Sequence, residues 1–481
     1  MYNTSLKSTA RKGIIWSAVD KFSVQFGQFV VGVFLARILM PEDFGLVAML
    51  SVFIALSQTF IESGLGIGLI QRQERKDIDF STLFVFNLGI SLFFYVVLFF
   101  SAPFISSFFE KPQLTYLTRI LGLILVINAF AIVQQTKLTI AIDFKSIAKS
   151  NVIGMITGGL CGVIAALNGY GVWSLVVQSL SRAFASSVTL WFLSNWYPSV
   201  AFSRKSFNSL FGYGSKLLLA GLYAQTLNNV YDVCVGKFYS TSSLGCYTRA
   251  KSFADISAGT ITSILKEATF PILASVQHDK EKLVSIYSRM IRISAFLIFP
   301  VMTLIALLAK PIVILLLTEK WISIVPLLQW IVFSRVFLPM SAINLNLLNA
   351  IGRSDLFLKV DLSKLPLTIL AMIITIPLGI KVMVIGHVIT SAIFFVINAY
   401  LPGKLFGYGA IKQLKDIFPF FIAVIGMAIL VVILICFIDN MVFKLFFGVV
   451  FGVIIYLFIC WLLKVDELQE VVKILSKYKK E

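Results

Sequence analysis

Charged residues interrupt several apolar stretches of this 481-residue chain. Arg182 lies near the middle of one such stretch, too deep for its side chain to reach water by snorkelling. A charge at the centre of a bilayer costs roughly 2.5–3.5 kcal/mol even on a lenient insertion scale. The cations in such positions are Arg182, Arg335, Lys21 and Lys266. Because Arg and Lys are the preferred donors to phosphate, these residues predict a cationic, water-filled cavity for an anionic head group.

Acidic residues lie in the same apolar stretches, namely Asp20, Glu62, Asp232 and Glu267. We expect them to carry a coupling ion, either H⁺ or Na⁺, and we expect no other cofactor. A structural role stays open, with Asp20 or Asp232 paired to Arg182. Snorkelling to a nearby membrane boundary is a further alternative for Glu62, Lys21 and Lys266. His387 is interpreted as a structural histidine.

Two polar stripes run along otherwise apolar segments at helical spacing. One comprises Ser17, Lys21, Gln25, Gln28 and Gly32; the other comprises Gly221, Gln225, Asn228, Asp232 and Gly236. A stripe at steps of three and four occupies one helix face. In a membrane that face must contact protein or water. The amides Gln25, Gln28, Gln225 and Asn228 therefore either line the cavity or hydrogen-bond between helices.

The composition places most of the chain in lipid. Apolar residues make up 58% of it, charged residues only 13%, and the mean hydropathy is +0.93. A soluble protein of this length needs a more charged surface. The net charge of +18 does not indicate nucleic-acid binding, because the basic residues fall between the apolar segments. The five cysteines form no metal-binding or redox motif.

An apolar segment of about 20 residues spans a membrane, and the chain accommodates about fourteen. The predicted spans are 14–39, 44–63, 82–109, 117–136, 150–168, 171–195, 213–238, 250–270, 291–309, 325–349, 359–380, 382–401, 416–438 and 441–463. Of the Lys and Arg residues in the tails, in the loops and toward the ends of these spans, 26 fall on the side that holds both termini and 10 on the other. Because positive loops stay inside, both termini are predicted to be cytoplasmic. The residues after Lys464 are predicted to form an amphipathic helix on the cytoplasmic leaflet.

The chain repeats itself at an offset of 200 residues. Gln25 aligns with Gln225, Arg37 with Lys237 and Gly45 with Gly245. Repeated halves build a central substrate site in many transporters. We therefore predict an all-α polytopic membrane protein with two six-helix bundles, residues 1–200 and 201–402, around a central cavity. Residues 403–481 add two helices and the tail.

No enzyme motif accompanies this architecture. The sequence contains no GxxxxGK[ST] phosphate loop, HExxH or GxSxG motif, and the loops are too short for a glycosyl-transfer site. We therefore expect no catalytic residue and no metal site.

Several motifs resemble the polysaccharide-transporter (Wzx-type) branch of the MOP superfamily, near its colanic-acid and teichuronic-acid exporters. They are LARILMPEDFGLVAM at Leu35–Met49, GLGIGLIQR at Gly64–Arg72, NGYGVWSLV at Asn168–Val176, LGCYTRA at Leu244–Ala250 and FPILASVQHDKEKL at Phe270–Leu283. Pro41 ends the first span, and Gly45 permits close packing at the periplasmic gate. A plain connecting turn is the alternative for this segment.

The resemblance implies two lobes, alternating access and a bacterial inner-membrane location. It also implies an undecaprenyl-diphosphate-linked oligosaccharide as substrate, and the polymerase and chain-length regulator of the same pathway as partners. A multidrug antiporter and a lipid II flippase remain alternatives, as does a non-transporting scaffold. Arg182 and Arg335 favour an anion over the organic cations of a multidrug antiporter.

Overall fold

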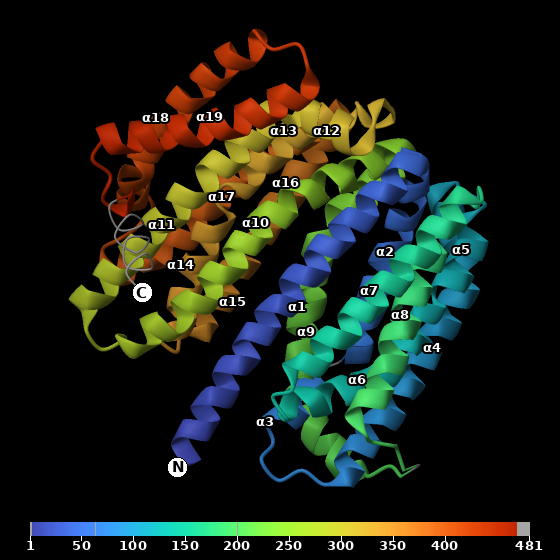
Figure 1. Ribbon diagram of the computed structural model, residues 1–481. Helices are drawn as coiled ribbons and strands as arrows, with labels where there is room; N and C mark the ends of the chain where they lie inside the picture. Colours follow the sequence, from blue (N-terminus) through green and yellow to red (C-terminus); the bar gives the residue numbers. More distant parts are fainter. Residues whose placement is uncertain (1, 63, 200, 469–481) are drawn as a thin grey trace. The chain divides into compact units, whose positions relative to one another are not determined.

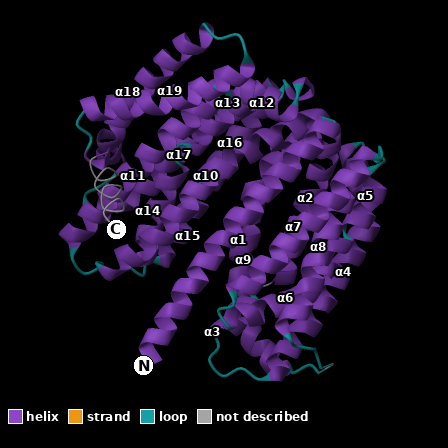
Figure 2. Ribbon diagram, viewed as in Figure 1, coloured by secondary structure: helices purple, strands orange, loops and turns teal. Residues whose placement is uncertain are grey.

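The computed structural model describes residues 2–62, 64–199 and 201–468. Within these residues the backbone forms α-helices, two short 3₁₀ helices and no strand (Figure 2). The predicted all-α fold is therefore confirmed.

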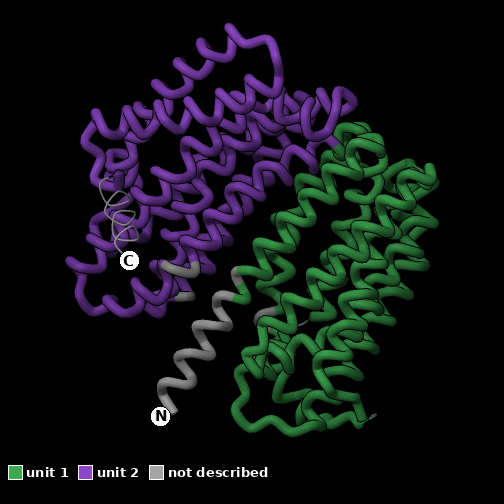
Figure 3. Tube along the Cα trace, viewed as in Figure 1, with its two compact units in different colours: residues 1–245 green, residues 246–481 purple. Residues whose placement is uncertain are grey.

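Contacts divide the chain into two compact units, residues 1–245 and 246–481 (Figure 3). The first holds α1 (Tyr2–Ile38), α2 (Pro41–Glu62), α3 (Leu65–Gln71), α4 (Asp77–Phe109), α5 (Leu114–Leu121), α6 (Leu123–Ile140), α7 (Phe144–Leu167), α8 (Trp173–Ser194) and α9 (Arg204–Phe238). This division falls after residue 245 because α9 packs against α2, α3 and α4 (Figure 1). The repeat boundary at residue 200 stays a prediction about the sequence.

The second unit contains most of α10 (Thr241–Ser275), which begins in the first. The remaining helices are α11 (Lys280–Leu307), α12 (Ala309–Leu317), η1 (Glu319–Trp321), α13 (Ile324–Arg335), α14 (Leu338–Ala350), α15 (Ser354–Leu362), α16 (Leu365–Thr375), η2 (Ile376–Leu378), α17 (Ile380–Phe406), α18 (Ala410–Cys436) and α19 (Met441–Leu462). Helix α11 is central, since it packs against α13, α14 and α18. Its residues Ile291, Ala295, Ile298 and Met302 are fully buried.

Ten helical segments of the described chain are long and apolar enough to cross a membrane. The total of fourteen therefore stays a prediction. Helix boundaries fall inside several predicted spans: 117–136 covers parts of α5 and α6, 325–349 covers α13 and α14, and 359–380 covers parts of α15, α16 and η2. Pro339 and Pro366 lie in the first turns of α14 and α16, where proline is tolerated because the first N–H groups have no helical partner.

Reciprocal backbone contacts join the first turns of α2 and α10. A Cβ atom added at Gly45 would lie 2.0 Å from the carbonyl oxygen of Thr241, and one at Gly245 would lie 1.9 Å from that of Pro41. Both contacts fall within residues 1–245. Pro41 and Thr241, like Gly45 and Gly245, are related by the 200-residue offset, so the two halves of the repeat meet through equivalent atoms. The close packing predicted at Gly45 is therefore confirmed, with Thr241 as its partner.

A buried polar cluster fixes α18 to the rest of its unit. The Tyr287 hydroxyl donates to the Asn344 amide oxygen and accepts from Gln413 Nε2 at 2.8 Å. Asn344 Nδ2 donates to Gln413 Oε1 at 3.2 Å, and all three side chains are fully buried. A satisfied buried network specifies one packing arrangement, so α11, α14 and α18 are held in register.

We predict that Gln413→Leu destabilises the protein, because Tyr287 and Asn344 lose partners that buried polar groups need. An unsatisfied buried polar group costs about 1–3 kcal/mol. Thermal unfolding of the purified protein in detergent measures the loss as a lower midpoint. The control is Lys412→Ala, which changes an exposed neighbour. Equal midpoints for the two variants would contradict the prediction.

The start of the tail is tied to α11. Arg292 Nε donates to Glu467 at 2.5 Å, and Glu467 and Val465 are buried. The predicted amphipathic helix lies mostly in residues 469–481, outside the described residues.

Candidate functional site

Arg182 is held where three helices meet in the first unit. Gly154, Gly158 and Gly162 form a stripe on α7, and added Cβ atoms there would overlap Gln178, Arg182 or Ser186 of α8. Small residues spaced by four let two helix backbones approach closely. The guanidinium of Arg182 extends from this contact to Gln28 of α1, whose amide oxygen accepts from both terminal nitrogens when the amide is oriented to fit them.

The partner of Arg182 is thus a neutral amide. No carboxylate among the described residues forms an ion pair with it. This excludes, for the described residues, the pairing of Arg182 with Asp20 or Asp232 that the sequence left open. Among the described residues no anion compensates the charge of the guanidinium, and the contact with Gln28 leaves some of its donors available.

The acidic candidates of the first unit lie on separate helices. Asp20 of α1 accepts two hydrogen bonds from Asn151 Nδ2 of α7, each 3.1 Å long, and its neighbour Lys21 is exposed. Glu62, also exposed, accepts from Gln58 Nε2 at 3.2 Å. Asp232 of α9 is only 7% exposed. Of the three acidic candidates in this unit, Asp20 and Asp232 are therefore at least partly removed from water.

The polar stripe of α9 hydrogen-bonds partly within its own helix. Asn229 Nδ2 donates to the backbone and side-chain oxygens of Gln225, at 2.8 and 3.2 Å. Asn228 is exposed, whereas Gln25 of α1 is half-buried. The alternative of hydrogen bonding between helices is observed for Gln28 with Arg182.

Arg335 in the second unit has a carboxylate partner. Its Nε donates to Asp255 Oδ1 of α10 at 2.6 Å, and the side chains are 14% and 43% exposed. His387 of α17 is half-buried near Arg335 and Lys251, and its structural role stays a prediction. Asp255 compensates the charge of Arg335, so this arginine has less capacity than Arg182 to bind an anion.

We predict that Asp255→Ala lowers the stability of the folded protein by about 1–3 kcal/mol, because Arg335 loses its charged hydrogen bond. The partial exposure of Asp255 keeps the cost below that of a fully buried pair. Thermal unfolding in detergent measures the change. The charge-reversed double variant Asp255→Arg with Arg335→Asp should recover part of the loss, and no recovery would argue against direct pairing.

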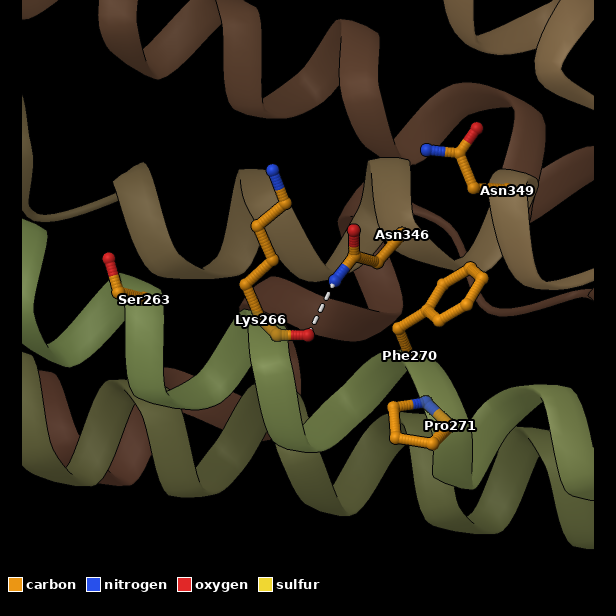
Figure 4. Close-up of a pocket in the computed structure, with 6 residues that line it drawn as sticks. All are labelled: Ser263, Lys266, Phe270, Pro271, Asn346 and Asn349. Carbon is orange, nitrogen blue, oxygen red and sulfur yellow. Dashed lines mark hydrogen bonds between the residues drawn. The ribbon is translucent and has the colours of Figure 1, made fainter. Parts of the chain in front are cut away.

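Lys266 of α10 lines a cavity of about 680 Å³ together with Ser263, Phe270, Pro271, Asn346 and Asn349 (Figure 4). Asn346 of α14 donates to the backbone oxygen of Lys266 at 3.1 Å. The structure therefore places Lys266 beside polar groups of a second helix. The side chain of the remaining acidic candidate, Glu267, lies outside the described residues.

Asp255, Asn151, Asn346 and Asn349 were not among the candidates predicted from the sequence. Asp255 carries the same signal as the other candidates, a charge inside an apolar span, and the same criterion applied throughout would have included it. Asn151, Asn346 and Asn349 gave no comparable signal, because neutral amides are common in membrane helices and only tertiary contacts distinguish them.

Residues 34–326 match the family model described as polysaccharide biosynthesis protein. The chain belongs to this family. Its motifs had indicated the polysaccharide-transporter branch of the MOP superfamily, and that recognition is confirmed.

The names of curated proteins that are similar to this chain agree with this family assignment. It is 22% identical over 400 residues to the teichuronic acid biosynthesis protein TuaB of Bacillus subtilis, covering 82% of this chain and 83% of the relative. It is 25% identical to the succinoglycan biosynthesis transport protein ExoT of Rhizobium meliloti, covering 72% and 70%. With the lipopolysaccharide biosynthesis protein WzxC of Escherichia coli it shares 24% identity, covering 68% and 66%.

Solved structures show the same fold. The lipid II flippase MurJ, in an inward closed conformation, superposes with a TM-score of 0.76 at 18% identity, covering 94% of this chain and 99% of that one. An inward-facing MATE-family multidrug transporter of the MOP superfamily gives 0.60 at 19% identity, covering 81% and 97%. At these identities the likeness establishes the fold alone. These structures are of transporters rather than enzymes.

Proposed function

We propose that this protein is a flippase that moves an undecaprenyl-diphosphate-linked oligosaccharide repeat unit from the cytoplasmic to the periplasmic leaflet. The repeat unit then serves exopolysaccharide, O-antigen or capsule assembly. Membership of a polysaccharide biosynthesis family and the transport proteins among the relatives support this proposal. The lipid tail stays in the bilayer during transport, and the charged head group crosses through the protein.

Arg182 is the observation that carries the proposal. A mid-helix arginine is costly in a membrane, and its observed partner Gln28 does not neutralise it. A guanidinium binds phosphate through paired hydrogen bonds, so a diphosphate head group would supply the missing negative charge. An organic cation would be repelled, which disfavours a multidrug antiporter.

Transport is proposed to proceed by alternating access and to be coupled to H⁺ or Na⁺. Asp20 and Asp232 are the proposed ion carriers among the described carboxylates, because both lie within helices and are partly or largely buried. We further propose an inner-membrane location with both termini in the cytoplasm. The polymerase and chain-length regulator of the pathway would then receive the repeat unit on the periplasmic side.

Mass spectrometry of polyprenyl-linked glycans tests the function. Cells with and without the gene are compared, with the downstream polymerase left intact. We expect one complete undecaprenyl-diphosphate repeat unit to accumulate on the cytoplasmic side when the gene is absent. Accumulation of lipid II would instead indicate a lipid II flippase. No accumulation together with altered drug or dye sensitivity would refute the proposal in favour of a multidrug antiporter.

A further inference from the structure

A cavity lined by both polar and apolar side chains lies between α10 and α14, entirely within the second unit. Its volume of about 680 Å³ falls within the range of about 300–1,000 Å³ typical of small-molecule sites. One cation, one hydroxyl and two amides line it, together with Phe270 and Pro271. No carboxylate belongs to this described lining, so the cavity is suited to a ligand that is both anionic and rich in hydroxyl groups.

Lys266 differs from the other two cations whose contacts are described here. Arg335 is paired with Asp255, and Arg182 is bonded to Gln28. Within the described part of the chain, the Lys266 ammonium makes neither a hydrogen bond nor an ion pair. It extends from α10 beside the amide of Asn346 (Figure 4). Its three donors are therefore available to a ligand.

The two asparagines contribute in different ways. Asn346 is buried and fixed, because its Nδ2 donates to the Lys266 backbone oxygen at 3.1 Å. Asn349 lies one turn further along α14 and is half-buried. An amide offers both donors and acceptors, which matches neighbouring sugar hydroxyls. Phe270 is 45% exposed and presents a flat apolar surface of the kind that packs against a pyranose ring.

The loop after α14 adds little net charge. Arg353 donates two hydrogen bonds to Asp355, at 2.9 and 3.0 Å. Hydrogen bonding to the Arg353 guanidinium lowers the pKa of the Asp355 carboxyl, so this exposed pair stays ionised and internally compensated. Of the described side chains that line the cavity, Lys266 is therefore the one that carries an uncompensated charge.

We propose that the cavity binds the glycosyl diphosphate part of the substrate, with Lys266 on the phosphate and Asn346 and Asn349 on the first sugar. This inference rests on the proposed function and makes Asn349 a specificity-determining residue. With the termini in the cytoplasm, α10 ends on the cytoplasmic side, and Lys266 lies within its last three turns. The cavity is thus the place where the head group is recognised before translocation.

The competing role for Lys266 is snorkelling to anionic lipid head groups at the membrane surface. A lysine in that role would respond to bilayer charge and would be indifferent to the sugar. Binding to soluble probes in neutral detergent separates the two roles, because no anionic lipid is then present.

The test measures binding of short-chain probes to the purified full-length protein by isothermal titration calorimetry. The probes are inorganic diphosphate, farnesyl diphosphate, and farnesyl diphosphate carrying glucose, galactose or N-acetylglucosamine. We expect Lys266→Gln to lower the affinity for every farnesyl probe by about tenfold or more, because a charged hydrogen bond is lost. Lys266→Arg should retain most of the affinity. The control Lys359→Ala removes an exposed lysine outside the cavity and should leave the affinity for every probe unchanged.

Asn349→Ala supplies the sharper outcome. It should lower the affinity for the preferred glycosylated probe by about 2- to 10-fold, which is the contribution of a neutral hydrogen bond. The affinity for farnesyl diphosphate should stay unchanged. Asn346 is left intact because it also links α10 to α14. The proposal is overturned if Lys266→Gln behaves like Lys359→Ala. It is also overturned if no glycosylated probe binds more tightly than farnesyl diphosphate, or if inorganic diphosphate binds as well as the farnesyl probes.

These outcomes are separable from failure of the proposed function. Accumulation of the repeat unit in cells lacking the gene, together with normal probe binding by Lys266→Gln, would leave the flippase intact and place its head-group site elsewhere. Absence of that accumulation would refute the flippase whatever the binding data show.

Discussion

Replacing Arg182 with alanine should reduce export of the repeat unit by about 10- to 100-fold at normal protein level. The guanidinium is expected to make charged hydrogen bonds to the diphosphate, each worth about 1.5–3 kcal/mol. Alanine retains the Cβ atom, which is the part of Arg182 nearest to Gly158. The α7–α8 contact should therefore survive, and the loss should be one of binding rather than folding. Accumulated repeat unit, quantified by mass spectrometry and normalised to immunoblotted protein, provides the measurement.

Three further variants test the assignment of Arg182. Arg182→Lys should retain part of the activity, because the charge stays but the paired geometry is lost. Gln28→Ala should have a smaller effect, since Gln28 orients the guanidinium without carrying charge. Lys111→Ala, in the loop between α4 and α5, is the control and should export normally. If Arg182→Ala exports as well as Lys111→Ala, the cationic cavity is wrongly placed and a scaffold role gains support.

Gly245→Ala should destabilise the protein and impair transport more strongly than Gly259→Ala in the same helix. The added methyl group would lie 1.9 Å from the Pro41 carbonyl oxygen, and a backbone atom cannot move aside as a flexible side chain can. Overpacking of this kind typically costs 1–3 kcal/mol. The first turns of α2 and α10 would have to separate. A lower thermal midpoint and reduced export would report the separation.

Gly259→Ala is the matched control because it lies in the same helix and an added Cβ there meets no atom within 4 Å. Alanine favours the helix over glycine by about 1 kcal/mol, so this variant should be neutral or slightly stabilised. Gly45→Ala should reproduce the defect of Gly245→Ala through Thr241. Equal behaviour of Gly245→Ala and Gly259→Ala would show that the contact between α2 and α10 is not tight in the membrane.

More of the fold than of the candidate site could be predicted from the sequence. Apolar runs longer than 20 residues indicate membrane helices whatever their neighbours are, and Pro41 begins α2 as a proline at a helix start should. The helix ends were harder to predict. Helix α10 extends from Thr241 to Ser275, beyond the predicted 250–270, because a helix continues past the apolar stretch that crosses the lipid.

The residues that contact the two arginines were the hardest feature of the site to predict from the sequence. Arg182 and Arg335 looked equivalent in sequence, since each is an arginine inside an apolar span. The structure distinguishes them: one contacts an amide on α1 and the other a carboxylate on α10. These partners lie 154 and 80 residues away in the chain, so local spacing could not reveal them.

The reciprocal contact of Gly45 with Thr241 and of Gly245 with Pro41 has an evolutionary consequence. A duplicated chain that keeps this contact cannot alter either glycine alone, because each methyl group would meet the backbone of the other copy. The two positions should therefore be under the same purifying selection in both halves. The two candidate arginines have no such counterpart: Val382 occupies the position equivalent to Arg182, and Gln135 that equivalent to Arg335. Selection can thus diversify the head-group chemistry of this protein while the contact between the repeats is preserved.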